Sequence, residues 1–241
     1  MLHGAEDGCD GLDHQRDGID LMQPWSQPLL WKGAVVISSP PSLDVASVSK
    51  QEFPGNVSPS VITFTTAQSN ELIFISFTVN STTGTVTSIS DNSGVTSAWA
   101  QAASQLVAGL GSLEIWYTKA SAPMSAASIS VVHPTTVTFF AVTAFGVTGA
   151  NTSAPFDGAA VTGPSDPLSI TTTVANDLVI AAYRSNTTSG PTAGTGMTQI
   201  GITGSYNVTE YRVASTAGTY SCPIAAGAGG SNAGIVLAVK H

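Results

Sequence analysis

The stretch "SLEIWYTKA" (residues 112–120) places two neighbouring aromatic residues between a glutamate and a lysine. The chain around it consists mainly of Ser, Thr, Ala, Gly and Val. Successive side chains of a β-strand point to opposite faces, so one face carries Leu113, Ile115 and Tyr117. We expect this face to pack on the core. Trp116 then lies beside Glu114 on the outer face. There it is either covered by another part of the protein or a subunit, or it stacks on a sugar.

Strand-like segments of the same kind recur from residue 58 to the end of the chain. They are rich in β-branched and aromatic residues, and most alternate with a period of two. Turn signals rich in Gly, Pro, Asn, Asp and Ser separate them. The segments are VITFTT (61–66), ELIFISFTV (71–79), TVTSIS (85–90), LEIWYTK (113–119), SISVV (128–132), TVTFFAVTAF (136–145), LSITTT (168–173), DLVIAAYRS (177–185), VTEYRVAS (208–215) and AGIVLAVK (233–240).

This pattern predicts an all-β fold, an antiparallel two-sheet β-sandwich of jelly-roll type, because no helical crossovers separate the strands. The segment 98–110 is compatible with one helix or with a strand that carries a bulge. We find no convincing internal repeat, and we expect one β-sandwich domain over residues 58–241.

Residues 1–57 differ from the rest and predict an extended N-terminal arm with at most one strand. Six of the 15 acidic residues fall within the first 20 positions, and several prolines follow them. Such composition is typical of disorder, but exposed tryptophans and the apolar run "GAVVIS" favour docking onto a neighbouring subunit. The residues expected to make these subunit contacts are Trp25, Trp31, Val35, Val36 and Ile37.

Composition and charge exclude several classes of partner. The net charge is −8 and only seven Lys and Arg residues occur, which argues against nucleic-acid binding. No run of about 18 apolar residues occurs, so we expect no membrane span. The Asp-Gly pairs near the N-terminus lack the spacing of a calcium-binding loop, and we expect no metal and no cofactor. Cys9 and Cys222 are expected to be unpaired thiols, although a disulfide between them is an alternative.

The surface implied by this composition is polar and almost uncharged. Ser and Thr supply 59 of 241 residues, while charged residues make up 9%, against roughly 25% in average globular proteins. Secreted, cell-surface and virion proteins have such surfaces. The start of the chain lacks the apolar segment of a signal peptide. A virion protein released by lysis satisfies both observations, as would a processed precursor or a wrongly assigned start codon.

An ordered series of motifs resembles the Ser/Thr/Gly-rich β-sandwich domains of phage virion proteins and bacterial secreted surface proteins. The resemblance covers about residues 58–241 and implies a fold and an exposed setting rather than a chemistry. The series comprises an Asp-x-x-Gly turn, a strand ending in Trp-Tyr, a Gly-Val turn and a Thr-Thr-x-x-x-Asp-Leu strand entry. The matching residues are Asp91, Gly94, Trp99, Trp116, Tyr117, Gly146, Val147, Pro155, Asp157, Thr172, Thr173, Asp177 and Leu178.

Signatures of catalysis are weak. His133 lies at a strand-to-turn corner without a nucleophile motif around it. Glu114 and Glu210 are mid-strand carboxylates beside aromatic residues, as a sugar-cleaving pair would require, but a structural or solvated role is favoured for both.

We therefore expect a non-enzymatic structural protein on the virion surface of a tailed phage, most simply a capsid decoration (cement) protein. It would be homo-oligomeric and would contact a major capsid or tail protein. The alternative is a secreted carbohydrate-binding or adhesive module, or a subunit of an extracellular filament. In that case Trp99, Trp116 and Tyr211 are the candidates for stacking on a glycan. A third alternative is a polysaccharide-degrading enzyme.

Overall fold

The computed structural model describes residues 39–54, 57–80, 85–107, 111–134, 137, 139–164, 166–185, 190–204, 206–225 and 231–241. These residues form strands and no helix, and all the strand pairs are antiparallel, which confirms the predicted all-β class. The strands are β1 (Ser42–Pro54), β2 (Ser60–Phe64), β3 (Glu71–Asn80), β4 (Ser88–Asp91), β5 (Ala100–Val107), β6 (Gly111–Ala120), β7 (Ala127–Val132), β8 (Phe139–Thr148), β9 (Val161–Gly163), β10 (Leu168–Thr172), β11 (Asp177–Ser185), β12 (Thr192–Ala193), β13 (Thr198–Thr203), β14 (Asn207–Ala214), β15 (Gly218–Cys222), β16 (Ile224–Ala225) and β17 (Ser231–Val239).

The strands fall into two halves with the same order. In the first half, a five-stranded sheet has the order β1-β8-β3-β6-β5 and a three-stranded sheet has the order β2-β7-β4. In the second half, a five-stranded sheet has the order β9-β17-β11-β14-β13, and the pairs β10-β15 and β12-β16 replace the smaller sheet. Numbered within each half, the two large sheets have the orders 1-8-3-6-5 and 1-9-3-6-5, and the orders coincide when β15 and β16, which only Pro223 separates, are counted as one strand. The chain thus contains an internal structural duplication.

The registers of the two large sheets agree along most of their central strands, and a shift between Arg184 and Ser185 interrupts the agreement. Leu72 lies opposite Val147 in the first half, as Leu178 lies opposite Val239 in the second. Each central strand follows an asparagine with a positive φ, 56° at Asn70 and 67° at Asn176, a conformation that Asn tolerates better than most residues.

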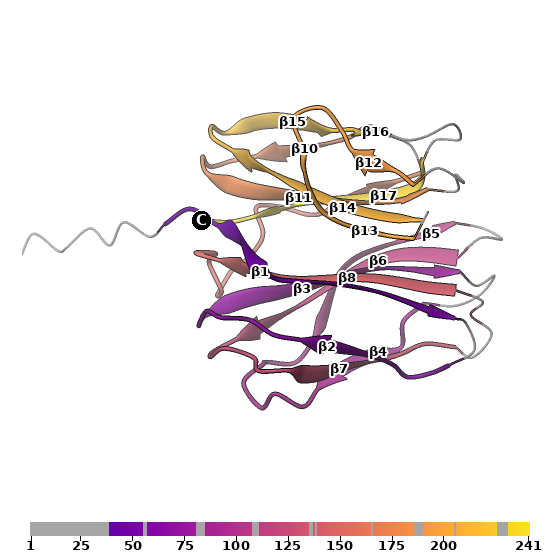
Figure 1. The fold of residues 1–241 in the computed structure, drawn as a ribbon. Coiled ribbons are helices and arrows are strands. Elements are labelled where there is room, and N and C mark those ends of the chain that lie inside the picture. The colour runs from indigo at the N-terminus through magenta and orange to yellow at the C-terminus, as the bar shows by residue number, and fades with distance from the viewer. Residues whose placement is uncertain are drawn as a thin grey trace, which may run out of the picture. The chain divides into compact units, whose positions relative to one another are not determined.

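The sheets lie in four layers with three apolar cores between them (Figure 1). The small sheet of the first half packs on one face of its large sheet, and the pairs β10-β15 and β12-β16 pack on the outer face of the second large sheet. The two large sheets pack on each other through the middle core. Strand β11 is consequently buried at every residue. Burial on both faces is the reason why these strands are nearly continuous apolar runs rather than strictly alternating ones.

The middle core differs between its two edges. Toward β5 and β9 it is aromatic, with the ring centroid of Phe156 4.9 Å from that of Tyr117 and 6.3 Å from that of Phe74. Toward β1 and β13 the large sheets approach closely, and Thr143 Oγ1 lies 2.9 Å from Thr203 Oγ1. The edge along β1 and β13 is therefore tightly closed.

Two features differ from the sequence-based expectation, and a third decides between two alternatives that the sequence left open. The single sheet pair expected over 58–241 is instead two sheet sets that share a core, because both large sheets are apolar on both faces. Ser42–Pro54, expected within the arm, forms β1, and Ser38–His241 forms one compact unit. The segment 98–110 contains β5, with a register shift between Gln101 and Ala103, so the strand with a bulge was the correct alternative.

Candidate functional site

Trp116 and Glu114 belong to a buried polar cluster. Leu113, Ile115 and Tyr117 pack in the middle core, as the alternation predicts, but the opposite face of β6 packs in the core of the first half. Glu114 is fully buried there and its carboxylate accepts four hydrogen bonds. The donors are Val86 N at 2.9 Å, Ser112 Oγ at 2.9 Å, Gln101 Nε2 at 2.7 Å and Trp116 Nε1 at 3.0 Å. The Glu114 carboxylate therefore links β5 and β6 to the segment just before β4, and its role is structural.

Trp99 borders a small pocket next to the Asp91 turn. The pocket has a volume of about 330 Å³ and is lined by Ile89, Ser90, Asp91, Thr96, Ser97, Ala98 and Trp99. Trp99 Nε1 donates to Asp91 Oδ2 at 2.8 Å, and Thr96 Oγ1 donates to the same oxygen at 2.7 Å. Burial acts to raise the pKa of Asp91, but the hydrogen bonds from Ser93, Thr96 and Trp99 outweigh it and hold the pKa below its usual value. Asp91 organises the turn that ends at Gly94, where φ is 70°.

Glu210 and Tyr211 lie in the second half, away from the other candidates. Glu210 is fully buried on the face of β14 that covers the third core, and its Oε2 accepts a hydrogen bond from Gly194 N at 3.0 Å. Burial raises the pKa of Glu210 to about 7. Tyr211 is half-buried in the middle core. The structure therefore separates Glu114 from Glu210 by the two large sheets, and it does not bring Trp99, Trp116 and Tyr211 onto one face.

The remaining candidates carry no assembled chemistry. His133 is buried, and its Nε2 lies 2.9 Å from Ser60 Oγ at a strand corner. Cys222 is a free thiol at 0% exposure, and burial raises its pKa to about 12. The predicted subunit contacts, Trp25, Trp31, Val35, Val36 and Ile37, lie outside the described residues, as does Cys9.

Two pairs of acidic residues occupy equivalent places in the two halves. Glu71 opens β3 beside Asp44 of β1, and Asp177 opens β11 beside Asp157, which precedes β9. Burial, and after it the neighbouring Asp44, raises the pKa of Glu71 to about 7. Burial and the interaction with Asp157 raise the pKa of Asp177 to about 6. Within each pair, one carboxyl group thus retains its proton at a pH well above the usual range.

Asp157 is the charged member of the second pair. Burial acts to raise its pKa, but hydrogen bonds from the backbone N–H and the hydroxyl of Thr173 hold the pKa below its usual value. In the first pair, both Glu71 carboxylate oxygens are buried, and the interaction with the Thr66 side chain lowers the pKa of Glu71 less than burial raises it. A protonated Glu71 satisfies this environment better than a charged one.

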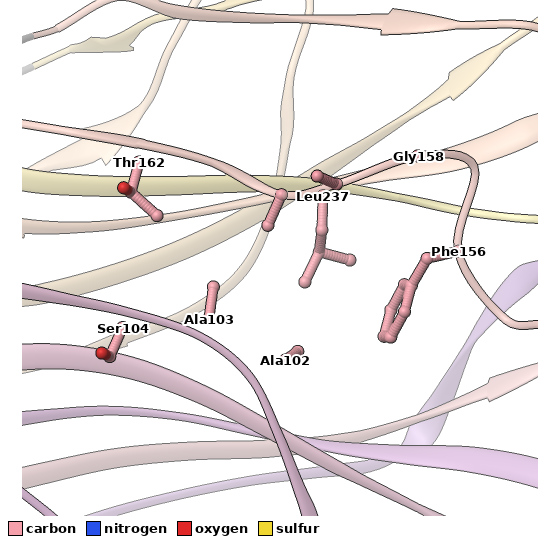
Figure 2. Close-up of a pocket in the computed structure, with 9 residues that line it drawn as sticks. Ala102, Ala103, Ser104, Phe156, Gly158, Thr162 and Leu237 are labelled. Carbon is pink, nitrogen blue, oxygen red and sulfur yellow. The ribbon is translucent and has the colours of Figure 1, made fainter.

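A second pocket, larger than the one beside Trp99, lies between β5 of the first half and β9 of the second. This β5–β9 pocket has a volume of about 410 Å³ and is lined by Ala102, Ala103, Ser104, Phe156, Gly158, Ala159, Ala160, Thr162 and Leu237. Figure 2 shows the hydroxyls of Ser104 and Thr162 toward one end and the ring of Phe156 toward the other. Because no lining residue is charged, the pocket suits an uncharged, largely apolar group.

No family model, curated protein or solved structure matches this chain. Within the described residues, no group of three or more His, Cys, Asp or Glu side chains is arranged to hold a metal ion. The same part of the chain contains no helix long and apolar enough to cross a membrane.

Sequence reasoning missed the acid pairs and the β5–β9 pocket. The signal for the pairs was present, since Asn70-Glu71-Leu72 and Asn176-Asp177-Leu178 repeat one another at the start of two apolar strands. The partners Asp44 and Asp157 had no such signal, because strand pairing alone brings them near. The pocket is lined mostly by Ala and Gly, residue types that mark no site in a sequence.

Proposed function

We propose that this chain is a non-enzymatic structural subunit of the virion surface of a tailed phage, in the role of a capsid decoration (cement) protein. Each half is proposed to be a jelly roll, and residues 1–38 are proposed to bind neighbouring subunits. The resemblance of residues 58–241 to β-sandwich domains of phage virion proteins supports this proposal.

The repeated strand order is the observation that carries this proposal. With β15 and β16 counted as one strand, strand 1 lies beside strand 8, strand 2 beside strand 7 and strand 3 beside strand 6 in both halves, the pairing of a rolled-up double hairpin. Jelly rolls of this kind recur in viral capsid and lectin domains. Because one fold serves many functions, this support is an analogy of architecture.

The placement of the acidic side chains also favours a structural role. The fully buried Glu71, Glu114 and Glu210 face sheet interfaces rather than a cleft. A glycosidase would need two carboxyl groups about 5–10 Å apart across a substrate site. Glu114 and Glu210 belong to different cores, so a polysaccharide-degrading activity of this pair is not proposed.

Decoration of native particles tests the proposal. The full chain and a chain that starts at Ser39 are added to particles that lack this protein, and electron cryo-microscopy records occupancy. A start at Ser39, rather than near residue 58, retains β1 and hence the edge of the first large sheet. The proposal expects regular density for the full chain and at least tenfold weaker binding for the shortened chain. Absence of the full chain from native particles would contradict it.

One observation favours a second candidate, a carbohydrate-binding module. The Trp99 pocket of about 330 Å³ combines a half-buried indole with Ser90, Thr96 and Ser97 hydroxyls, and aromatic rings commonly stack on the apolar faces of ligands. A glycan array with a Trp99→Phe control decides between the candidates, since this change keeps a ring but removes the hydrogen bond to Asp91. Reproducible glycan binding that Trp99→Ala abolishes would favour the module over the virion protein.

A further inference from the structure

The internal duplication allows the β5–β9 pocket to be compared with its equivalent at the opposite edge. Gln101 of β5 and Gln199 of β13 both precede a register shift, at Ala102 and Ile200 respectively. The registers therefore make Ala102 the counterpart of Ile200. Gly201, the counterpart of Ala103, lies so close to the first large sheet that a Cβ atom there would be 2.8 Å from Thr143 Cγ2.

The strands β1 and β9 give a second pair of counterparts. Asp44 pairs with Gly146, and the N–H of Asp157 donates to the carbonyl of Ala238, at equivalent places on β8 and β17. The pairing resumes at Ser49 in the first half and at Val161 in the second, so Val48 corresponds to Ala160.

The same place is therefore filled at one edge and hollow at the other. Ile200 is 7% exposed and belongs to the middle core, and Val48 packs against that core. At the β5–β9 edge, Ala102 and Ala160 replace these side chains and leave a pocket of about 410 Å³. Because branched aliphatic side chains fill the β1–β13 edge, we expect the β5–β9 pocket to accept side chains of the same type.

The strand beside the pocket is an open and uncharged edge. Among the described residues, strand β5 pairs only with β6, so no described strand pairs with its other edge. Its sequence, AQAASQLV, contains no charge and leaves Leu106 57% exposed. Strand β1, at the other edge of the same sheet, carries Asp44, Lys50 and Glu52. Charges protect a sheet edge against added strands, and β5 lacks them.

We propose that the β5–β9 pocket is the acceptor site for an extended strand of a second copy of this chain. The strand pairs with the open edge of β5 and places a branched aliphatic side chain in the pocket, where Ala102 and Ala160 leave room for it. Main-chain hydrogen bonds supply affinity and the pocket supplies specificity, as in other cases of strand addition.

The chain contains one segment outside its described residues that fits this description. The run "GAVVIS" (33–38) ends immediately before the described part of the chain, has no charge, and carries the β-branched residues Val35, Val36 and Ile37 in succession. We assign this run of a second copy as the donor. This assignment rests on the proposed function, because it requires that copies of the chain assemble. It concerns a single contact between two copies, which experiments in solution can detect.

Disulfide trapping between two full-length chains tests the site. One chain carries Ser104→Cys at the pocket and the other carries Ser38→Cys beside the run, both in a Cys9→Ser background; Cys222 is buried. Only an intermolecular pair can form. We expect a cross-linked dimer under mild oxidation, and at least a tenfold lower yield when the acceptor also carries Ala102→Ile, which fills the pocket. Ala160→Val is a second filling variant, and circular dichroism verifies that both remain folded.

A matched control uses Thr171→Cys, an exposed position on β10, in place of Ser104→Cys. Equal cross-linking at Thr171 and Ser104, or a yield that neither filling variant lowers, would overturn the acceptor site. Particle decoration without the cross-link would reject this site and leave the proposed function standing. The cross-link in a protein that is absent from particles would reject the virion role alone.

Discussion

The two edges of the middle core are built from equivalent strands, yet they differ in completeness. At the β1–β13 edge, Ile200 and Val48 fill the space between the large sheets. A hydrogen bond between the Thr143 and Thr203 hydroxyls joins the two sheets there. At the β5–β9 edge, Ala102 and Ala160 occupy the same positions and leave a pocket. The strand order is the same at both edges, but at the β1–β13 edge the large sheets approach closely and branched aliphatic side chains fill the space that remains. The fold thus needs both central sheets but does not need both edges filled.

Removing the filling side chain from the closed edge should have the largest effect. Ile200→Ala deletes three buried carbon atoms, and large-to-small core changes of this kind cost about 2–5 kcal/mol. Urea unfolding of the full chain measures the change. Leu106→Ala on the open edge is the matched control, since an exposed side chain should cost less than about 0.5 kcal/mol. Similar losses at both positions would contradict the distinction between the edges.

The acid pairs test the similarity of the two halves. The pKa of Glu71 is raised to about 7 from an ordinary value of 4.5, so near neutral pH the folded protein retains a proton that the unfolded chain releases. Stability conferred by this proton is complete below about pH 4.5 and is lost as pH rises toward 7, at about 1.4 kcal/mol per pH unit at most. Asp177 should act in the same direction up to about pH 6.

We therefore expect the free energy of unfolding to fall by roughly 2–3 kcal/mol between pH 5 and pH 7.5. Glu71→Gln should reduce this dependence and raise stability at pH 7.5, while the contributions of Asp177 and Glu210, whose pKa values are raised in the same direction, remain. Glu52→Gln, at an exposed position, is the control. Chemical denaturation across this pH range provides the measurement. A wild-type profile that rises with pH would show that Glu71 is charged in the folded protein.

Filling the open edge should have a smaller effect with the opposite sign. Ala102→Ile copies the residue that the closed edge uses, and cavity-filling substitutions commonly contribute about 0.5–2 kcal/mol. Thermal unfolding monitored by circular dichroism measures the gain. Ala154→Val, an exposed change outside the pocket, is the control. A loss of about 1–3 kcal/mol would indicate overpacking and would mean that the two positions are not equivalent.

The smallest effect is expected within the polar cluster of the first half. Trp116→Phe keeps a ring but removes one of the four hydrogen bonds to Glu114, which should cost about 1 kcal/mol. Equilibrium unfolding measures this cost, and glycan binding by the same variant should equal that of the wild type. A glycan affinity that depends on the Trp116 indole would contradict its assignment as a structural residue.

The sequence predicted the strands better than it predicted their arrangement. The alternation in LEIWYTK placed Leu113, Ile115 and Tyr117 in a core correctly, but it gave no sign that the other face is buried as well. Apolar runs such as ELIFISFTV are compatible with a strand buried on both faces, and that signal was present. The duplication escaped notice because only short motifs repeat, while strand order and register, which define it, are set by long-range pairing.

For the candidate sites too, the sequence identified residues but not their arrangement in space. Residue type selected Glu114, Glu210 and three aromatic residues as candidates, but chemistry depends on which side chains share a cleft. The layers separate Glu114, Trp99 and Trp116 from Glu210 and Tyr211. The pocket between β5 and β9 is lined by segments more than 50 positions apart in the sequence, and most of its lining residues are Ala or Gly. No local pattern marks such a place. Comparison of the halves reveals it because the same backbone carries larger side chains at the other edge.

Hydrogen–deuterium exchange with peptide resolution tests most directly whether the two halves depend on one shared core. The amides of β3 and β11 should exchange with the same free energy of opening. Phe74→Ala removes a ring that the first half contributes to the middle core, and it should lower the protection of both strands by a similar amount. If Phe74→Ala lowers protection in β3 while β11 exchanges as in the wild type, the halves are independent and the shared-core account is wrong.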